Sequence, residues 1–329
     1  MRRKTGCTPG RSVSGAVRRL PLLLLTLCVM LAACGAARPR DSSPQTGTPA
    51  RIFASGGRGP ASSEAPVMAT AAFHPELAEG SGGVLIDLSA VSEGYVAVSA
   101  RSESRLKFQT LMGEWTYTYD LSSDGVPSIF PLQCGDGHYL FRVMENIVDK
   151  KYALTYSTEC DVKLLDEFQP FLRPNDYSRY DAQSECVRLA ARLAEQSRDK
   201  LDFVSAVYEY VCDHITYDAA KAESITTIYL PDVDKTLSSG KGICFDYAAL
   251  AAAMLRSQGV PTKIVFGYVA PDDLYHAWNM FYTEESGWIT VSFEVGSKSW
   301  NRIDLTFSAG GASDEFVGDG SHYSAAYFY

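Results

Sequence analysis

The stretch "GKGICFDYAALAAAMLRSQGVPTKIVFGYV", residues 240–269, predicts a turn, a helix and a strand in immediate succession. Two glycines favour a turn at its start, and the alanine- and leucine-rich run that follows favours a helix. Gly259 can cap this helix and Pro261 prevents its continuation, so the apolar residues 262–269 are predicted to form a strand. Cys244 therefore lies in the first turn of the predicted helix.

Further elements are predicted on both sides of this stretch. Two helices precede it, over residues 182–196 and from Leu201 to Ile215, where apolar residues recur at helical spacing. Strand-like segments follow it at 276–283, 287–293 and 300–307. Helices followed by consecutive strands predict an α+β domain with helices packed on an antiparallel sheet, which we place at residues 173–329. The apolar C-terminal residues 323–329 are expected to dock on this fold as a strand.

The chain before this domain has a β pattern. Short β-leaning runs separated by turn-forming residues recur between about Gly83 and Lys163. In one of them Tyr117, Tyr119 and Leu121 alternate with polar residues, which is the period of a strand with one buried face. We predict a small all-β sandwich at residues 79–172.

The N-terminus has the pattern of an export signal. Six basic residues precede an apolar run that is too short to span a membrane convincingly, so residues 1–33 are predicted to be a signal peptide. The four residues "LAAC" that end at Cys34 resemble the lipobox of bacterial lipoproteins, with an ordinary signal peptide cut near "ACGAA" as the alternative. We expect Cys34 to be lipidated and the Ala-, Pro-, Ser- and Gly-rich residues 34–78 to form a flexible tether.

Charge restricts the partners of the chain. The formal net charge is −9, and removing residues 1–33 takes away six of the 30 basic residues and none of the 39 acidic ones, which leaves −15. Such an acidic protein is poorly suited to nucleic acid or to anionic lipid headgroups. We expect an extracytoplasmic monomer, held to the bacterial cell membrane by its lipid anchor, that binds no nucleic acid.

Cysteine parity separates Cys244 from the others. Two of the eight cysteines leave with the signal peptide and Cys34 is predicted to carry lipid. Apart from Cys244, four cysteines then remain: Cys134, Cys160, Cys186 and Cys212. The sequence is compatible with two disulfides among these four, in more than one pairing, or with four reduced thiols. Cys244 is then unpaired, which favours a chemical role for it.

The surroundings of Cys244 favour a nucleophile. A helix start stabilises a thiolate, and its free N–H groups can receive the oxyanion of a tetrahedral intermediate. His276 in "YHAWNM" can act as the base, and Asp304 in "WNRIDLTF" can hold the far nitrogen of its ring. Asn279 is too close in sequence to be preferred for that role, and Glu294 is a substitute for Asp304.

These segments together resemble the transglutaminase-like superfamily. The shared pattern is a glycine-flanked cysteine that opens a helix, "GVP" that closes it, a strand ending in "GY", then "HAW", then Trp followed four residues later by Asp. The resemblance covers about residues 199–310. It implies a papain-like fold with the triad Cys244, His276 and Asp304, in which a thioester on the cysteine is resolved by water or an amine. The implied substrates are peptide, protein or cell-envelope amides.

One position departs from this pattern. The first suitable Trp after the histidine is Trp288, and the residue four positions later is Ser292, which would break the triad. Trp300 fits better because Asp304 follows it, so we predict Asp304 and an extra hairpin before it. The alternative is a binding or scaffold lipoprotein that keeps the fold without catalysis.

Other residues complete the predicted site. We expect Asp246, Tyr247 and Trp278 to shape it through packing and hydrogen bonding. The other histidines lack the spacing of a metal site, and the chemistry requires no cofactor.

Overall fold

The computed structural model describes residues 67–225, 229–269, 274–293, 300–303 and 323–329. The chain from Ser62 onward forms one compact unit. The predicted signal peptide, Cys34, Asp304 and most of the predicted tether lie outside the described residues. Within the described residues, no helix has the length and apolar character needed to cross a membrane.

The N-terminal part of this unit is a β-sandwich. One antiparallel sheet has the order β1 (Glu79–Ser81), β2 (Val84–Asp87), β3 (Tyr95–Ala100), β6 (Ser128–Pro131). The other has the order β5 (Trp115–Leu121), β4 (Leu106–Met112), β7 (Gly137–Val148), β8 (Lys151–Val162). Phe108 of β4 stacks on Phe130 of β6 with ring centroids 4.7 Å apart, so the core lies between the two sheets. The predicted sandwich is confirmed, whereas its boundaries as a domain stay a prediction.

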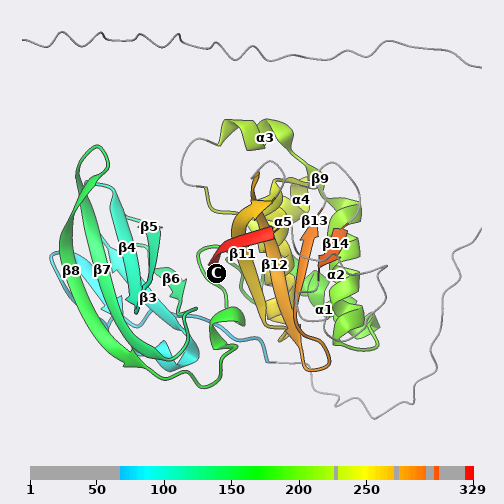
Figure 1. Ribbon diagram of the computed structural model, residues 1–329, viewed down its shortest axis with the longest axis horizontal. Coiled ribbons are helices and arrows are strands. Elements are labelled where there is room, and N and C mark those ends of the chain that lie inside the picture. The colour runs from blue at the N-terminus through cyan, green and yellow to red at the C-terminus, as the bar shows by residue number, and fades with distance from the viewer. Residues whose placement is uncertain (1–66, 226–228, 270–273, 294–299, 304–322) are drawn as a thin grey trace, which may run out of the picture. The chain divides into compact units, whose positions relative to one another are not determined.

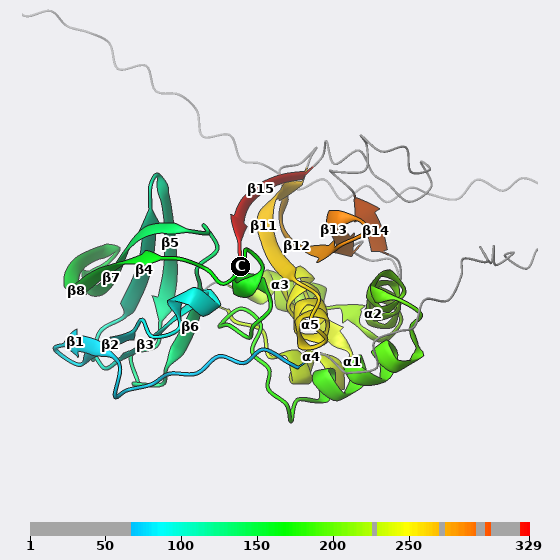
Figure 2. The ribbon, with the colours of Figure 1, turned by 90° about the horizontal axis from the view of Figure 1, so that it is seen from below.

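The remainder is the predicted α+β arrangement. The 3₁₀ turn Gln169–Phe171 precedes the helices of the described residues, whereas a second 3₁₀ turn, Val91–Glu93, lies between β2 and β3 of the sandwich. These helices are α1 (Glu185–Gln196), α2 (Lys200–His214), α3 (Ala219–Ser224), α4 (Val233–Ser239) and α5 (Cys244–Ser257). An antiparallel sheet has the order β14 (Trp300–Ile303), β13 (Gly287–Phe293), β12 (Leu274–Thr283), β11 (Thr262–Val269), β15 (Tyr323–Phe328). A small parallel pair joins β9 (Thr216–Tyr217) to β10 (Lys241–Gly242). The helices lie on one face of the five-stranded sheet (Figures 1 and 2).

Helix α5 is the buried centre of this arrangement. Its residues Phe245–Ser257 are all buried, as expected for a helix that is apolar around most of its circumference. Asp246 accepts a hydrogen bond from the backbone N–H of Ile243 (2.8 Å), which satisfies one free donor at the helix start. Gly259, just after the helix end, adopts the left-handed φ of 73° that favours glycine. The sequence signals for both helix ends are therefore confirmed.

Strand β15 confirms the expected docking of the C-terminal residues. Tyr329 exchanges two backbone hydrogen bonds with Ile264, and its carbonyl oxygen accepts a hydrogen bond from the buried Arg256 (2.8 Å). Its ring stacks on Tyr177 with centroids 4.0 Å apart and lies edge-on to Tyr119 of the sandwich. Aromatic packing thus connects the sheet to the β-sandwich.

The structure also differs from the predicted elements. Helix α1 begins at Glu185 and not at residue 182, because the N-cap Ser184 has an extended backbone. Helices α3 and α4 were not predicted, since six- and seven-residue helices carry too little periodicity to be recognised. Both precede Cys244 in the chain.

Candidate active site

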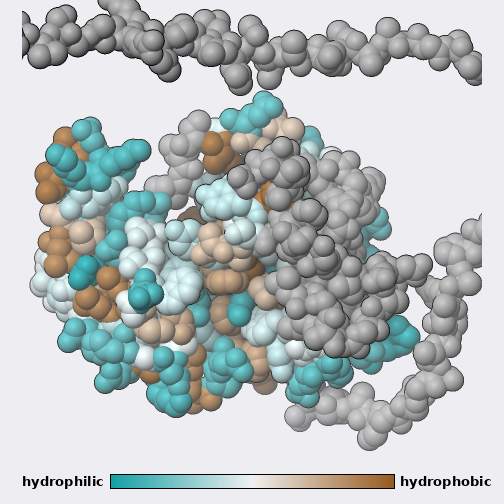
Figure 3. Space-filling model, in the orientation of Figure 1, coloured by the Kyte–Doolittle hydropathy of each residue, from teal (hydrophilic) through white to brown (hydrophobic). Residues whose placement is uncertain are grey.

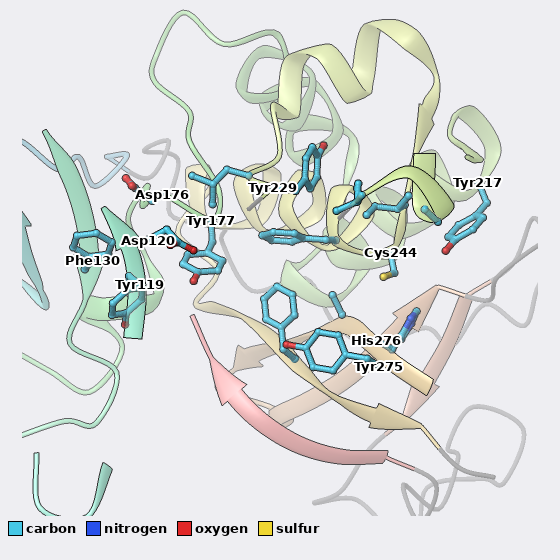
Figure 4. Close-up of a pocket in the computed structure, with 17 residues that line it drawn as sticks. Tyr119, Asp120, Phe130, Asp176, Tyr177, Tyr217, Tyr229, Cys244, Tyr275 and His276 are labelled. Carbon is cyan, nitrogen blue, oxygen red and sulfur yellow. The ribbon is translucent and has the colours of Figure 1, made fainter. Parts of the chain in front are cut away.

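A cavity of about 520 Å³ lies at the start of α5, and both Cys244 and His276 line it (Figure 4). Most of the lining is aromatic or aliphatic. Six aromatic residues of the α+β part contribute to it: Tyr177, Tyr217, Tyr229, Phe245, Phe266 and Tyr275. The prediction that the cysteine and the histidine come together therefore agrees with this geometry.

The β-sandwich contributes to the same cavity. Tyr119 and Asp120 of β5 and Phe130 of β6 line it, although the sandwich has no recognisable catalytic motif. Lys107 forms an ion pair with Asp120, and Arg179 pairs with the other lining carboxylate, Asp176. The cavity is thus aromatic, and its two acidic groups are paired.

Cys244 is the first residue of α5 and is partly buried. Burial raises the pKa of its thiol above the ordinary value, whereas the backbone N–H groups of Ala277 and Phe245 act in the opposite direction and the charge of Asp246 raises it again. The start of α5 and strand β12 each supply a donor, but desolvation outweighs them. The resting thiol is therefore protonated at neutral pH, and the predicted nucleophilic role of Cys244 would require a base.

His276, the predicted base, lines the same cavity as Cys244. The residue is buried on β12, and burial lowers the pKa of its imidazole to about 4. Figure 4 shows its ring on the side of the sheet toward which the sulfur of Cys244 points. A neutral imidazole retains a lone pair for a proton, and Ser292 lies 3.1 Å from Nε2, which leaves Nδ1 available.

The unexpected feature of the site is the group that contacts the histidine of the predicted triad, which is a serine hydroxyl. Asp304 and its substitute Glu294 lie outside the described residues, so the role of Asp304 stays a prediction. Strand β13 lies directly beside β12, and its Ser292 provides the hydrogen bond to His276. Asn279 instead bonds to Tyr208 and to the backbone of α5, so it serves the helix face of the sheet.

The packing of Trp278 explains the glycine in "GY". A Cβ atom added to Gly267 would lie 2.6 Å from Cη2 of Trp278 and 2.1 Å from the backbone oxygen of Ser324. The Trp278 ring stacks with the ring of His276 at a centroid distance of 6.4 Å and an interplanar angle of 19°. Only a residue without a side chain therefore fits beneath the tryptophan that flanks the histidine.

The other two predicted shaping residues have different surroundings. Tyr247 donates a hydrogen bond to the carbonyl oxygen of Ile215 (2.8 Å), which fixes α5 to the chain after α2. Asp246 is fully buried and accepts hydrogen bonds from Ile243, Lys221 and Tyr229. Both residues form hydrogen bonds, but Lys221 and Tyr229 were not predicted as partners of Asp246.

Tyr217 was also missed by sequence reasoning. It lines the cavity on β9, and burial together with the nearby Cys244 raises the pKa of its hydroxyl. The segment "DHITYDAAKAES" resembles the one that precedes the cysteine helix in the superfamily, but nothing in it distinguishes Tyr217 from other tyrosines. Its proximity to the thiol depends on the pairing of β9 with β10.

Besides Cys244, the free thiols among the described residues include Cys134, Cys160 and Cys186. Cys186 and Cys212 are buried on α1 and α2, and Cys134 and Cys160 are partly buried in the sandwich. Among the described residues, no group of three or more metal-binding side chains is placed to hold an ion.

Comparison with known proteins identifies the domain. Residues 187–293, which include Cys244 and His276, match the sequence model of the transglutaminase-like superfamily. The chain contains a transglutaminase-like domain. Kyphoscoliosis peptidase from Homo sapiens is 28% identical over 155 residues, which are 44% of this chain. The chain spans only 21% of the length of that relative.

Solved structures similar to the transglutaminase-like domain and its surroundings share little sequence with it. Red sea bream transglutaminase is 11% identical and aligns over 67% of this chain and 52% of its own, with a TM-score of 0.33. The periplasmic domain of TgpA from Pseudomonas aeruginosa is 17% identical over 70% of this chain and 73% of its own, with a TM-score of 0.30. Similarities this distant give no information about activity.

Proposed function

We propose that the chain is a membrane-anchored, extracytoplasmic thiol enzyme of the cell envelope that forms a thioester at Cys244 on peptide or protein amides. The observation that carries this proposal is the shared cavity, in which the thiol at a helix start faces the strand of a buried, neutral histidine. The match of residues 187–293 to the transglutaminase-like superfamily supports the same reaction class.

The proposed reaction uses Cys244 and His276 in turn. His276 accepts the thiol proton as sulfur attacks the amide carbon, because the resting pair is neutral and no preformed thiolate is required. Collapse of the tetrahedral intermediate breaks the C–N bond, and the imidazolium returns the proton to the departing amine. Water or a second amine then attacks the thioester, with His276 again taking the proton and returning it to sulfur.

Backbone and side-chain donors near the sulfur are suited to the oxyanion. The N–H groups of Phe245 and Ala277 already point at Cys244. In the proposed mechanism the hydroxyl of Tyr217 on β9 adds a donor from the lining of the cavity. Donors fixed before the reaction stabilise the developing charge without reorganising.

The aromatic lining indicates which substrates are suitable. Because Asp120 and Asp176 are paired, the cavity offers ring surfaces and few free charges. We therefore expect an apolar or aromatic side chain beside the reacting amide, held in part by Tyr119 and Phe130 of the sandwich. Hydrolysis is supported by the name of the human relative, a peptidase.

Incubation with an aromatic glutamine-containing peptide and a fluorescent primary amine tests the reaction. Mass spectrometry of the peptide separates cleavage, deamidation and amine incorporation, and Cys244→Ala is the matched control. Wild-type protein should give at least one product and a thioester adduct on Cys244. If the wild-type protein and Cys244→Ala give the same background level of product with every envelope peptide tested, the proposed enzymatic function is refuted.

A scaffold function without catalysis is the second candidate. The observation that favours it is the hydroxyl of Ser292, where a carboxylate would orient the histidine more strongly. This candidate predicts that Cys244 reacts with iodoacetamide at the rate of an ordinary buried thiol. His276→Ala would then leave that rate unchanged.

The proposed anchor has its own test. In a bacterial host, labelled fatty acid should enter the wild-type chain, and the protein should remain with the membrane fraction. Cys34→Ala should lose the label and appear in the soluble extracytoplasmic fraction. Unlabelled wild-type protein would contradict lipidation and leave the thiol chemistry unaffected.

A further inference from the structure

A buried ion pair lies directly behind the proposed nucleophile. Asp246 follows Cys244 by two residues on α5, and its side chain is fully buried. Lys221 of α3 reaches it from outside, with Nζ 2.6 Å from Oδ2. The Lys221 side chain is 28% exposed, so it connects the buried carboxylate with the surface.

Two further donors complete the surroundings of the Asp246 carboxylate. Tyr229 donates to Oδ1, and the backbone N–H of Ile243 donates to Oδ2 at 2.8 Å. The ammonium of Lys221 also lies 2.6 Å from the Tyr229 hydroxyl and 4.5 Å from the centroid of its ring. Gly242 leaves room for this network, since a Cβ there would lie 2.7 Å from Cβ of Asp246. All the donors converge on one carboxylate.

The negative charge of Asp246 opposes ionisation of Cys244. It raises the pKa of the thiol, in addition to the larger effect of burial. Among the described residues, the other titratable groups near the sulfur are Tyr217 and Tyr275, whose pKa values are raised by burial, and His276, whose pKa is lowered to about 4. These groups are neutral at neutral pH, so Lys221 provides the positive charge that opposes Asp246.

We propose that Lys221 is a positioning residue that offsets the charge of Asp246 at the nucleophile and fastens α3 to the start of α5. The second role follows from the cavity, because Ala222 and Ile225 beside Lys221 form part of its wall. The inference rests on the proposed function, in which Cys244 is the reactive thiol. Lys221 itself does not line that cavity.

The test measures alkylation of Cys244 by iodoacetamide from pH 5 to pH 10, followed by mass spectrometry of the peptide that contains it. Lys221→Met leaves Asp246 unopposed, so its profile should move to higher pH and its rate at pH 7.5 should fall by about three- to tenfold. Asp246→Asn should move the profile to lower pH. The double variant should return toward wild type.

The opposite directions separate electrostatics from simple loss of structure. Damage to the fold would change the two single variants in the same direction and make the double variant worst, which would overturn the proposal. Lys221→Arg retains the charge and should resemble wild type, whereas Lys235→Met on α4 controls for an equal change in net charge. If Asp246→Asn does not fold, identical profiles for Lys221→Met and Lys221→Arg would overturn the proposal.

Alkylation does not depend on turnover, so the result is separable from the proposed activity. A protein that shows no reaction with amides can still show the predicted shifts of the alkylation profile. That result would support the role of Lys221 at the thiol and contradict the proposed enzymatic function. Conversely, if the enzyme is active but its alkylation profile does not change on substitution of Lys221, the proposed function stands and the inference about Lys221 is wrong.

Discussion

Removing the hydroxyl of Ser292 should disable the histidine without removing it. Ser292 and His276 are both buried, at 3% and 6% exposure, and Oγ lies 3.1 Å from Nε2. Ser292→Ala leaves a buried ring nitrogen without its hydrogen bond, which costs about 1–3 kcal/mol. If the lost hydrogen bond makes the reactive tautomer and orientation of the ring less favourable by this amount, alkylation and turnover should slow by about 5- to 150-fold.

Matched variants assign the effect to the correct group. Ser292→Thr retains a hydroxyl and should keep most of the rate, whereas Asp304→Asn removes the carboxylate predicted from sequence. Ser292→Asp should raise the pKa of His276 from about 4, because an adjacent carboxylate stabilises imidazolium. Its alkylation profile should therefore extend to lower pH than that of wild type.

The assay is the pH-dependent rate of iodoacetamide alkylation at Cys244, with circular dichroism to confirm folding of each variant. A wild-type profile for Ser292→Ala together with a large loss for Asp304→Asn would refute the role of Ser292 and restore the sequence-based triad. A large loss for Ser292→Ala with no effect of Asp304→Asn would establish a Cys-His-Ser arrangement.

Three further predictions follow from packing, burial and the cavity. Gly267→Ala should lower the free energy of unfolding in urea by about 1–3 kcal/mol, since its Cβ would lie 2.6 Å from Trp278, and a wild-type value would contradict that packing. Because the pKa of His276 is lowered from 6.5 to about 4, the folded state binds fewer protons than the unfolded state between these pH values. The free energy of unfolding of the wild-type protein should therefore fall by about 3 kcal/mol from pH 6.5 to pH 4, relative to that of His276→Gln. Parallel pH curves for the two proteins would argue against the burial of His276. Phe130→Ala should slow alkylation by a phenylalanyl chloromethyl ketone several-fold more than alkylation by iodoacetamide, whereas Leu154→Ala, exposed on β8, should affect neither reagent. Equal effects of Phe130→Ala on both reagents would exclude an aromatic subsite at that wall.

The sequence contained enough information for the main elements of the fold. Helical and strand periodicity, the glycine and proline near the end of α5 and the alternation in β5 are local signals, and they located most of these elements within a few residues. Helices α3 and α4 were missed, because their positions depend on caps and tertiary contacts more than on periodicity. The motifs around Cys244 and around His276 were recognisable because the residues of each motif are adjacent in the sequence.

The site required more than these local signals. The sandwich residues Tyr119 and Phe130 reach the cavity only through packing between segments far apart in the chain. Lys221 meets Asp246 across 25 positions, and no spacing rule relates a residue on a short helix to the start of another. Such encounters arise from tertiary packing, so one sequence without this arrangement does not reveal them.

The sequence by itself determined that Cys244 opens a buried helix and that His276 lies on a following strand, because helix ends and strand alternation are set by nearby residues. Only the tertiary structure decided the ionisation of this pair. Burial holds the thiol protonated and the imidazole neutral, and it outweighs the helix-start N–H groups from which a thiolate was expected. Desolvation depends on every segment packed around a group, whereas a helix start is a property of a few neighbouring residues.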